Sequence, residues 1–302
     1  MTDTRDDAVY AEGPQLRGLA YRLLGSMADA EDVVQTAYTR WFALAVAERE
    51  RVANPGAWLS TVVSRLCIDL QRSARARREV YVGEWLPEPL PGNGSVAGRP
   101  AELDPSERVT LDESISMAFL VMLESMTAAE RVSFILHDVY RYPFADIAEI
   151  VGRSPEACRQ LASAARRHVR EADAPVSSTV ADQAEVLDAL MRSWERQDIE
   201  GLVGVLDPNV RFVADGGGQV SAVLDPIDGA DLVARQLAEI RSRAGDLQLE
   251  PHEVNGRPGL VARIGGKVVT VFGFEFAGRR VCRIFAVRNP DKLDRWRGAS
   301  RS

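Results

Sequence analysis

Residues 143–170 read PFADIAEIVGRSPEACRQLASAARRHVR, and their pattern predicts two short helices joined by a tight turn. Ile147 and Val151 lie one helical turn apart and give the first helix an apolar face. Gly152 is the residue type that most often adopts the left-handed conformation ending a helix. Ser154, followed directly by a proline and a glutamate, is typical of a helix start. The stretch therefore predicts a helix-turn-helix.

The second helix of this pair separates apolar residues from long polar ones. Cys158, Leu161 and Ala165 form its predicted buried stripe. A DNA-recognition helix needs such an apolar back and a front of hydrogen-bond donors. The donors on the remaining faces are Arg159, Gln160, Ser163, Arg166, Arg167 and Arg170. An ordinary amphipathic helix pair remains the alternative, because turn-linked helices are common packing units.

Composition places the chain among globular proteins of two or three domains, with 302 residues, 46% hydrophobic and 27% charged. The net charge of −7 argues against a generally basic nucleic-acid coat but leaves local basic faces open. Cys67, Cys158 and Cys282 have no CxxC spacing, so we expect free, mostly buried thiols and no metal site. No apolar run reaches the length of a membrane span, which predicts a cytoplasmic protein without a membrane segment.

The N-terminal part of the chain is predicted to be a disordered lead over residues 1–12 and a helical domain over residues 13–80. A helix begins near Asp29, and its apolar stripe excludes four polar residues close to its start. Acidic residues are favoured there by the helix dipole, so simple capping and an acidic docking face are both open. The four residues are Asp29, Glu31, Asp32 and Gln35.

A third long helix is expected from Ala57, after the break at Asn54-Pro55-Gly56. Residues 61–80 contain five arginines and two acids, a local charge of +3. A solvated helix end and a face that follows DNA phosphates are both compatible with this charge. The polar residues outside the apolar stripe include Arg65, Asp69, Arg72 and Arg75.

Residues 81–106 are rich in proline and glycine and predict a linker. Trp85, Leu86 and Leu90 are unusual in a plain linker, so we expect part of it to dock on a surface. Residues 107–173 are predicted to be helical again and to contain the helix-turn-helix. Residues 152–171 carry five arginines and two acids, a second local charge of +3.

The remaining residues predict an α+β domain over residues 179–293, followed by a short tail over residues 294–302. Three helices are expected at 180–197, 199–206 and 229–243, with strands at 210–214, 247–254, 259–264, 267–276 and 279–287. Gly265-Gly266 and Ala277-Gly278 are good hairpin turns. We expect a curved antiparallel sheet.

Catalysis in this last domain is weakly indicated. Its one histidine, His252, fits a strand edge or a surface, and Asp215 fits a turn held by its own side chain. No metal-binding triad, catalytic triad or phosphate loop is apparent, so we expect no enzyme activity, no metal and no cofactor. A simple repressor with one DNA reader is disfavoured by the two separate arginine-rich blocks.

Several motifs together resemble a bacterial alternative sigma factor of the extracytoplasmic-function group. They are LLGS at 23–26, DAEDVVQ at 29–35, PGAWL at 55–59, RLCID at 65–69 and the helix-turn-helix. Residues from about 175 to 290 resemble a SnoaL-like, NTF2-type cone that a subgroup of these factors carries. This subgroup has WLPEPL, DGGGK-like and NPDKL motifs, here at 85–90, 215–219 and 289–293. Gln219 stands where the subgroup usually has lysine.

The resemblance implies two all-α sigma domains, the region 2 and region 4 domains, followed by the cone. It further implies that core RNA polymerase, through its β′ clamp and β subunit, and promoter DNA are the partners. Asp29, Glu31, Asp32 and Gln35 would dock on the β′ clamp. The helix after Trp58 would open the −10 element and region 4 would bind the −35 element. The implied DNA-binding residues are Arg65, Asp69, Arg72, Arg75, Arg153, Ser154, Glu156, Arg159, Gln160, Ser163, Arg166 and Arg167.

The resemblance also implies control within the chain. The cone would hold the sigma domains or the linker, so that no obligate separate anti-sigma factor is needed. A cone that senses a small ligand, or acts as an enzyme, on a DNA-binding regulator remains the alternative. The residues implied in interdomain regulation are Trp85, Leu86, Pro87, Asp215, Gly216, Gly217, Gly218, Asn289, Pro290 and Asp291.

Overall fold

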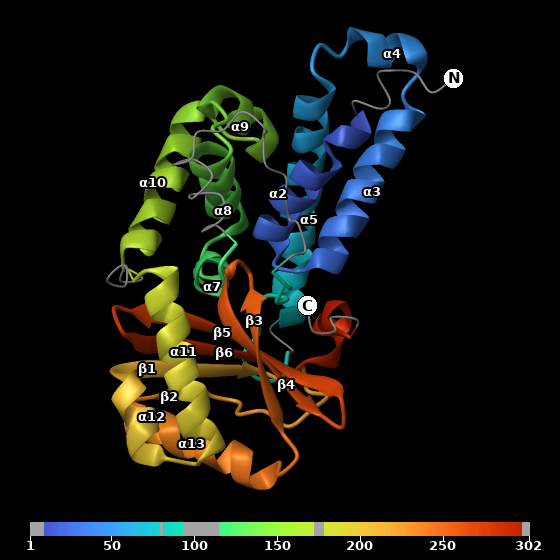
Figure 1. The fold of residues 1–302 in the computed structure, drawn as a ribbon. Helices are drawn as coiled ribbons and strands as arrows, with labels where there is room; N and C mark the ends of the chain where they lie inside the picture. The colour runs from blue at the N-terminus through green and yellow to red at the C-terminus, as the bar shows by residue number, and fades with distance from the viewer. Residues whose placement is uncertain (1–8, 79–80, 93–114, 172–177, 298–302) are drawn as a thin grey trace. The chain divides into compact units, whose positions relative to one another are not determined.

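A computed structural model describes residues 9–78, 81–92, 115–171 and 178–297, with side chains of 74–78 and 171 excepted. It divides into two compact units (Figure 1). The first contains residues 1–79, 95–115 and 122–172, and the second contains residues 80–94, 116–121 and 173–302. The second unit thus includes the start of the predicted linker. Within the described residues, none of the helices combines the length and apolarity needed to cross a bilayer.

The first unit is entirely helical in its described parts. Its N-terminal block, which we call the region 2 block, contains α2 (Gly13–Leu24), α3 (Met27–Ala43), α4 (Val46–Arg51) and α5 (Pro55–Arg78). Leu19, Val33 and Leu59 come from three of these helices and are all buried. Ser26 caps α3 by accepting a hydrogen bond from the Asp29 amide at 3.2 Å.

Two boundaries of the region 2 block differ from the predictions. Residues 9–11 are helical and Val9 is buried, although we expected a disordered lead through residue 12. Residues 1–8 lie outside the described part of the chain. The long helix α5 begins at Pro55 instead of Ala57. Proline is favoured at the first helical position because its missing N–H would have no partner there in any case.

The second block of this unit, the region 4 block, spans residues 122–171. It contains the end of α7 (Met117–Glu124), then α8 (Ala128–Phe134), the π-helical turn η1 (Ile135–Val139), α9 (Phe144–Val151) and α10 (Pro155–Glu171). Thr127 and Glu130 form a capping box at the start of α8. The predicted start of the region 4 domain at residue 107 lies outside the described residues.

The second unit is an α+β domain, as predicted. Its helices are α11 (Val180–Glu195), α12 (Ile199–Val205) and α13 (Ala230–Arg243). Its strands are β1 (Leu206–Asp215), β2 (Ile227–Asp228), β3 (Gln248–Val254), β4 (Arg257–Ile264), β5 (Lys267–Ala277) and β6 (Arg280–Val287). They form one sheet in the order β2-β1-β6-β5-β4-β3 (Figure 1).

The expectation of a fully antiparallel sheet was wrong at one pair of strands. β1 runs parallel to β6, with Phe212 opposite Ile284, whereas the other neighbouring pairs are antiparallel. The two-residue strand β2 was not predicted either. The connection from β1 to β6 runs through β2, α13 and the three strands β3 to β5, and local alternation does not encode a pairing over that distance.

The sheet is covered on both faces, because alternate residues of each strand point to opposite sides. Phe272 and Phe274 belong to a core closed by α11, α12 and α13, where Trp194 donates a 2.6 Å hydrogen bond to the Leu237 carbonyl. Val271 and Phe285 belong to a second cluster on the other face. Segments distant in sequence complete that second cluster: Leu86 of the linker, Met117 at the start of α7, and Leu293 and Trp296 near the C-terminus.

Candidate nucleic-acid interface and linker-binding site

The helix-turn-helix forms as the sequence predicted. Gly152 ends α9 in the left-handed conformation, with φ of 70° and its amide bonded to the Ala148 carbonyl. The Ser154 hydroxyl accepts a hydrogen bond from the Ala157 amide at 3.2 Å and so caps α10. Cys158 and Ala165 are fully buried on the inner face of α10. The helix therefore has the apolar back that the pattern indicated.

The outer face of α10 presents polar side chains to solvent. Gln160, Ser163 and Arg167 are exposed. Arg153, in the turn, is exposed as well. Glu156 and Arg159 are also exposed but form an ion pair with one another, and the Arg159 guanidinium lies 5.3 Å from the centre of the Phe144 ring. The face thus presents hydrogen-bond donors, and the positive charge of Arg159 on it is partly neutralised by Glu156.

Arg166 differs from the other predicted DNA-binding residues. Its guanidinium makes two hydrogen bonds to the Asp138 carboxylate, Nε to Oδ1 at 2.9 Å and Nη2 to Oδ2 at 3.1 Å. Both side chains are partly shielded from solvent. A bidentate pair of this kind fixes the two helical segments to each other. The geometry therefore gives Arg166 a structural role, whereas its neighbour Arg167 is exposed to solvent.

This distinction predicts different results for two adjacent substitutions. Arg167→Ala should weaken promoter binding by about 1–3 kcal/mol and reduce its salt dependence, because an exposed cation is lost. Arg166→Ala should instead destabilise the region 4 block by about 1–3 kcal/mol, because Asp138 loses its charged partner. Binding measured at several salt concentrations, together with thermal unfolding, separates the two. Equal stability loss in both variants would contradict the assignment.

In α5, Arg65, Asp69 and Arg72 are exposed. The Arg65 side chain donates a 2.8 Å hydrogen bond to the Glu149 carbonyl in α9. Asp69 and Arg72 form a loose, exposed ion pair at 3.8 Å. The side chain of Arg75 lies outside the described part of the structure. Because exposed pairs contribute little, Arg72 can exchange Asp69 for another anion at small cost.

The predicted docking residues share one solvent-exposed face of α3. Asp29, Glu31, Asp32 and Gln35 are all exposed, whereas Val33 and Val34 between them are buried. Asp29 lies in the first turn, where a carboxylate is favoured by the helix dipole. The capping interpretation and the docking interpretation are therefore compatible for this residue.

The linker binds to the second unit around one buried carboxylate, that of Asp215 at the end of β1. Its Oδ1 accepts hydrogen bonds from the Tyr81 hydroxyl at 2.5 Å and the Gly217 amide at 3.0 Å. Its Oδ2 accepts from the Leu86 amide at 2.9 Å and from Lys292 Nζ at 2.6 Å. Asp215 is fully buried. The predicted side-chain turn at Asp215 is present, but it is one part of a larger site.

Lys292 and Tyr81 are two members of this site that the predicted residue set did not contain. Lys292 also donates to the Leu86 carbonyl at 2.5 Å, and its Nζ lies 4.1 Å from the centre of the Trp85 ring. Burial, followed by the hydrogen bond to Asp215, raises the pKa of Tyr81. The NPDKL motif was the signal for Lys292, whereas no motif pointed to Tyr81.

The glycine turn after Asp215 brings its backbone against the C-terminal motif. A Cβ on Gly217 would collide with the Asn289 side chain, and Gly217 has φ of +62°, so both space and conformation require glycine. Asn289 Nδ2 donates to the Tyr81 hydroxyl at 2.9 Å. The Gln219 side-chain amide donates a 2.7 Å hydrogen bond to the Asp291 carboxylate. A neutral amide thus makes this contact at the position where the subgroup usually has lysine.

The far end of the linker adds to the edge of the sheet. The Gly92 amide donates to the Glu253 carbonyl, and the Asn255 amide donates to the Leu90 carbonyl, both at 2.9 Å. The Asn255 side-chain oxygen accepts a hydrogen bond from the Leu90 amide at 2.9 Å. Leu86 and Leu90 are buried, so the expectation that part of the linker docks is confirmed for residues 81–92. Residues 93–106 lie outside the described structure.

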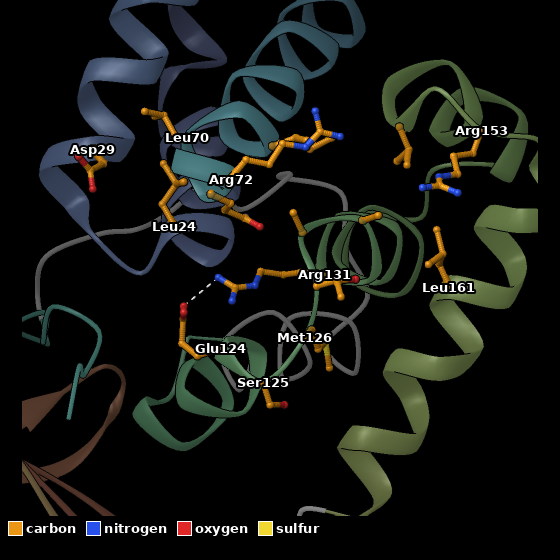
Figure 2. Close-up of a pocket in the computed structure, with 16 residues that line it drawn as sticks. Leu24, Asp29, Leu70, Arg72, Glu124, Ser125, Met126, Arg131, Arg153 and Leu161 are labelled. Carbon is orange, nitrogen blue, oxygen red and sulfur yellow. Dashed lines mark hydrogen bonds and ion pairs between the residues drawn. The ribbon is translucent and has the colours of Figure 1, made fainter. Parts of the chain in front are cut away.

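A cavity of about 580 Å³ lies within the first unit, between α5, α8 and the helix-turn-helix (Figure 2). Arg131 and Glu124 form an ion pair of 2.8 Å at its wall. Arg72 and Arg153, two of the predicted DNA-binding residues, also line it (Figure 2). The cavity has both apolar and charged walls.

Comparison with known proteins matches both helical blocks. Residues 9–77 match the family model described as Sigma-70 region 2, and residues 116–169 match Sigma-70, region 4. The ECF RNA polymerase sigma factor SigJ of Mycobacterium tuberculosis is 37% identical over 92% of this chain and 89% of its own length. Probable ECF RNA polymerase sigma factor SigI of the same species is 32% identical, covering 91% of this chain and 90% of its own.

The similarity extends to the folded structure. The crystal structure of Mycobacterium tuberculosis extracytoplasmic function sigma factor SigJ has a TM-score of 0.71 and 34% sequence identity. The match covers 94% of this chain and 96% of that chain, so it includes the C-terminal α+β domain as well as the helical blocks. The comparisons do not support the alternative of a ligand-sensing or enzymatic cone fused to a DNA-binding regulator. The chain belongs to the extracytoplasmic-function sigma factors of RNA polymerase, which recognise promoters and initiate transcription.

Proposed function

We propose that the exposed face of α10 contacts the −35 promoter element and that α5 contacts and opens the −10 element. This proposal is supported by the burial pattern, which leaves Gln160, Ser163 and Arg167 facing solvent. Arginines along α5 supply the cations that a DNA backbone requires. The acidic face of α3 docks on the β′ clamp of core RNA polymerase, where complementary charge speeds association and sets orientation. These partners place the protein's activity in the cytoplasm.

The C-terminal unit acts as a regulator within the chain, not as an enzyme. The observation that carries this proposal is the binding of the linker around Asp215, which fixes residues 81–92 on the sheet. A linker held there restricts the freedom of the two sigma blocks that it joins. RNA polymerase, or a ligand that prefers the released linker, would shift this equilibrium. A separate anti-sigma factor is then unnecessary for control.

The experiment that tests both proposals is run-off transcription with bacterial core RNA polymerase on the gene's own upstream region. Full-length protein is compared with a chain ending near Pro175 and with one ending near Val287. We expect transcription that depends on the factor, and a change of at least about threefold when the C-terminal motif is removed. Equal transcription from all three chains would overturn cis control. A factor in which Asp29, Glu31 and Asp32 are replaced by lysine should lose core binding while it keeps its fold.

A further inference from the structure

Three side chains from three segments of the region 4 block form a stack beside the helix-turn-helix. His137 of η1 stacks on Phe144 of α9, with 3.9 Å between the ring centres and 27° between the ring planes. The guanidinium of Arg159 in α10 lies over the same phenyl ring, 5.3 Å from its centre. We call His137, Phe144 and Arg159 the Phe144 stack. It joins a predicted DNA-binding residue to two aromatic rings that no motif had singled out.

The two rings of the Phe144 stack are fixed by the backbone around them. The chain between them turns with Arg141 in the left-handed conformation, at φ of 61°. His137 Nδ1 lies 3.0 Å from the Tyr142 carbonyl oxygen, and a carbonyl can only accept, so Nδ1 is the donor. Phe144 is the first residue of α9, and both rings are half-buried. The orientation of this platform is therefore set by η1 and α9 and not by DNA.

Arg159 is the exposed member of the stack. Its side chain is 56% exposed, and its ionic partner is the exposed Glu156, three residues earlier on α10. An exposed ion pair contributes little, so another acceptor can replace Glu156 at small cost. A long side chain that samples many rotamers loses this freedom when it binds. The phenyl ring attracts the guanidinium by its charge and reduces the number of orientations that it samples.

Arg159 also occupies the part of α10 that suits contact with bases. The helix begins at Pro155, so Arg159 lies in its second turn. The N-terminal residues of a recognition helix are those that contact base edges in the major groove. Arginine reads guanine through two hydrogen bonds, to O6 and N7, which require the guanidinium fork to be aligned with the base. A guanidinium that is already oriented pays less entropy for this alignment.

We infer that Phe144, supported by His137, is a positioning residue for promoter recognition, which orients the Arg159 guanidinium to read a guanine of the −35 element. Phe144 acts through Arg159 and needs no DNA contact of its own. The inference rests on the proposed contact of α10 with the −35 element and deepens it. It selects one arginine of α10 as a base reader and names the side chains that orient it.

The test measures the base preference of the RNA polymerase holoenzyme assembled with the full-length factor. Fragments of the gene's own upstream region, which together carry every single base change in the −35 element, compete for the holoenzyme. Phe144→Leu removes the ring but keeps an apolar side chain, whereas Phe144→Tyr keeps the ring. Arg159→Ala removes the proposed reader. Val151→Ala, at a half-buried position of the same helix, is the matched control for lost packing.

Arg159→Ala should lower the preference for guanine at one position of the −35 element by about tenfold. Phe144→Leu should lower the preference at the same position by about threefold to fivefold. This second effect should vanish in the Arg159→Ala background, because both residues act through one contact. Phe144→Tyr and Val151→Ala should keep the wild-type preference. The salt dependence of binding should be unchanged in both Phe144 variants, since no phosphate contact is lost.

Two results would overturn the inference while the proposed function stands. One is a wild-type base preference in Phe144→Leu beside a lost preference in Arg159→Ala. The other is a loss of affinity in Phe144→Leu that is equal for all fragments and persists in the Arg159→Ala background, which would give Phe144 a packing role alone. If Arg159→Ala, Ser163→Ala and Arg167→Ala all leave every position of the −35 element unchanged, the proposed contact of α10 fails and the inference fails with it.

Discussion

Asp215→Ala should lower the free energy of unfolding of the C-terminal unit by about 3–5 kcal/mol, because Lys292 would be left as a buried cation without its partner. The substitution also removes the acceptor for the Tyr81 hydroxyl and for the Leu86 amide. Denaturant dependence of hydrogen exchange at the β1 and β6 amides measures the change in this unit alone. The linker amides of residues 81–92 should lose protection at the same time.

Two control variants make this prediction specific. Asp215→Leu combined with Lys292→Met replaces the buried pair by apolar groups, so it should recover the part of the stability lost to the unpaired Lys292 cation. The part lost because the Leu86 amide and the Tyr81 hydroxyl have no acceptor should remain lost. Asp291→Ala removes an exposed carboxylate from the same site, and we expect it to lower the free energy of unfolding by less than about 1 kcal/mol. A loss in the Asp291 variant as large as in Asp215→Ala would show that the buried charge is not the cause.

Trp296→Ala should destabilise the same unit by about 3–5 kcal/mol, because a fully buried indole is replaced by a cavity. The indole Nε1 donates a 2.8 Å hydrogen bond to the Pro89 carbonyl, and the ring lies edge-on to His252 with 6.0 Å between centres. The unit's melting temperature should fall by roughly 10 °C. Run-off transcription with the Trp296→Ala variant should approach that of the chain ending near Val287.

Trp296→Phe separates packing from hydrogen bonding at this position. It keeps most of the buried apolar volume but leaves the Pro89 carbonyl without its donor. We therefore expect the free energy of unfolding to fall by about 1–2 kcal/mol. Calorimetry of the full-length protein and its two variants gives the comparison. If both variants are as stable as the wild type, Trp296 does not hold the linker.

Local chemistry in the sequence was sufficient for the helical blocks. Gly152 and Ser154 define the turn of the helix-turn-helix through backbone conformation and capping, which depend on neighbouring residues alone. Periodicity also identified which face of α10 is buried. The capping box at Thr127 and the exposed acids of α3 follow from the same local rules. These features could be predicted because they need no knowledge of distant segments.

The sequence was less informative about the sheet. Asn255-Gly256, with φ of 50° and 75°, is a strong hairpin signal that our strand boundaries did not use, and β4 therefore begins two residues earlier than expected. The parallel pairing of β1 with β6 had no local signal. The order of strands follows from which apolar faces meet in the folded core, and many pairings share the same alternation.

The motifs of this chain by themselves determined its family, its two DNA-binding blocks and the residue types at each face. Tertiary structure alone decided the partners: Asp138 for Arg166, Lys292 and Tyr81 for Asp215, and Leu23 for Arg131. The physical reason is that helix caps and amphipathic faces arise from residues within a few positions of each other. The partner of a buried charge is chosen by the packing of segments that lie far apart in the chain.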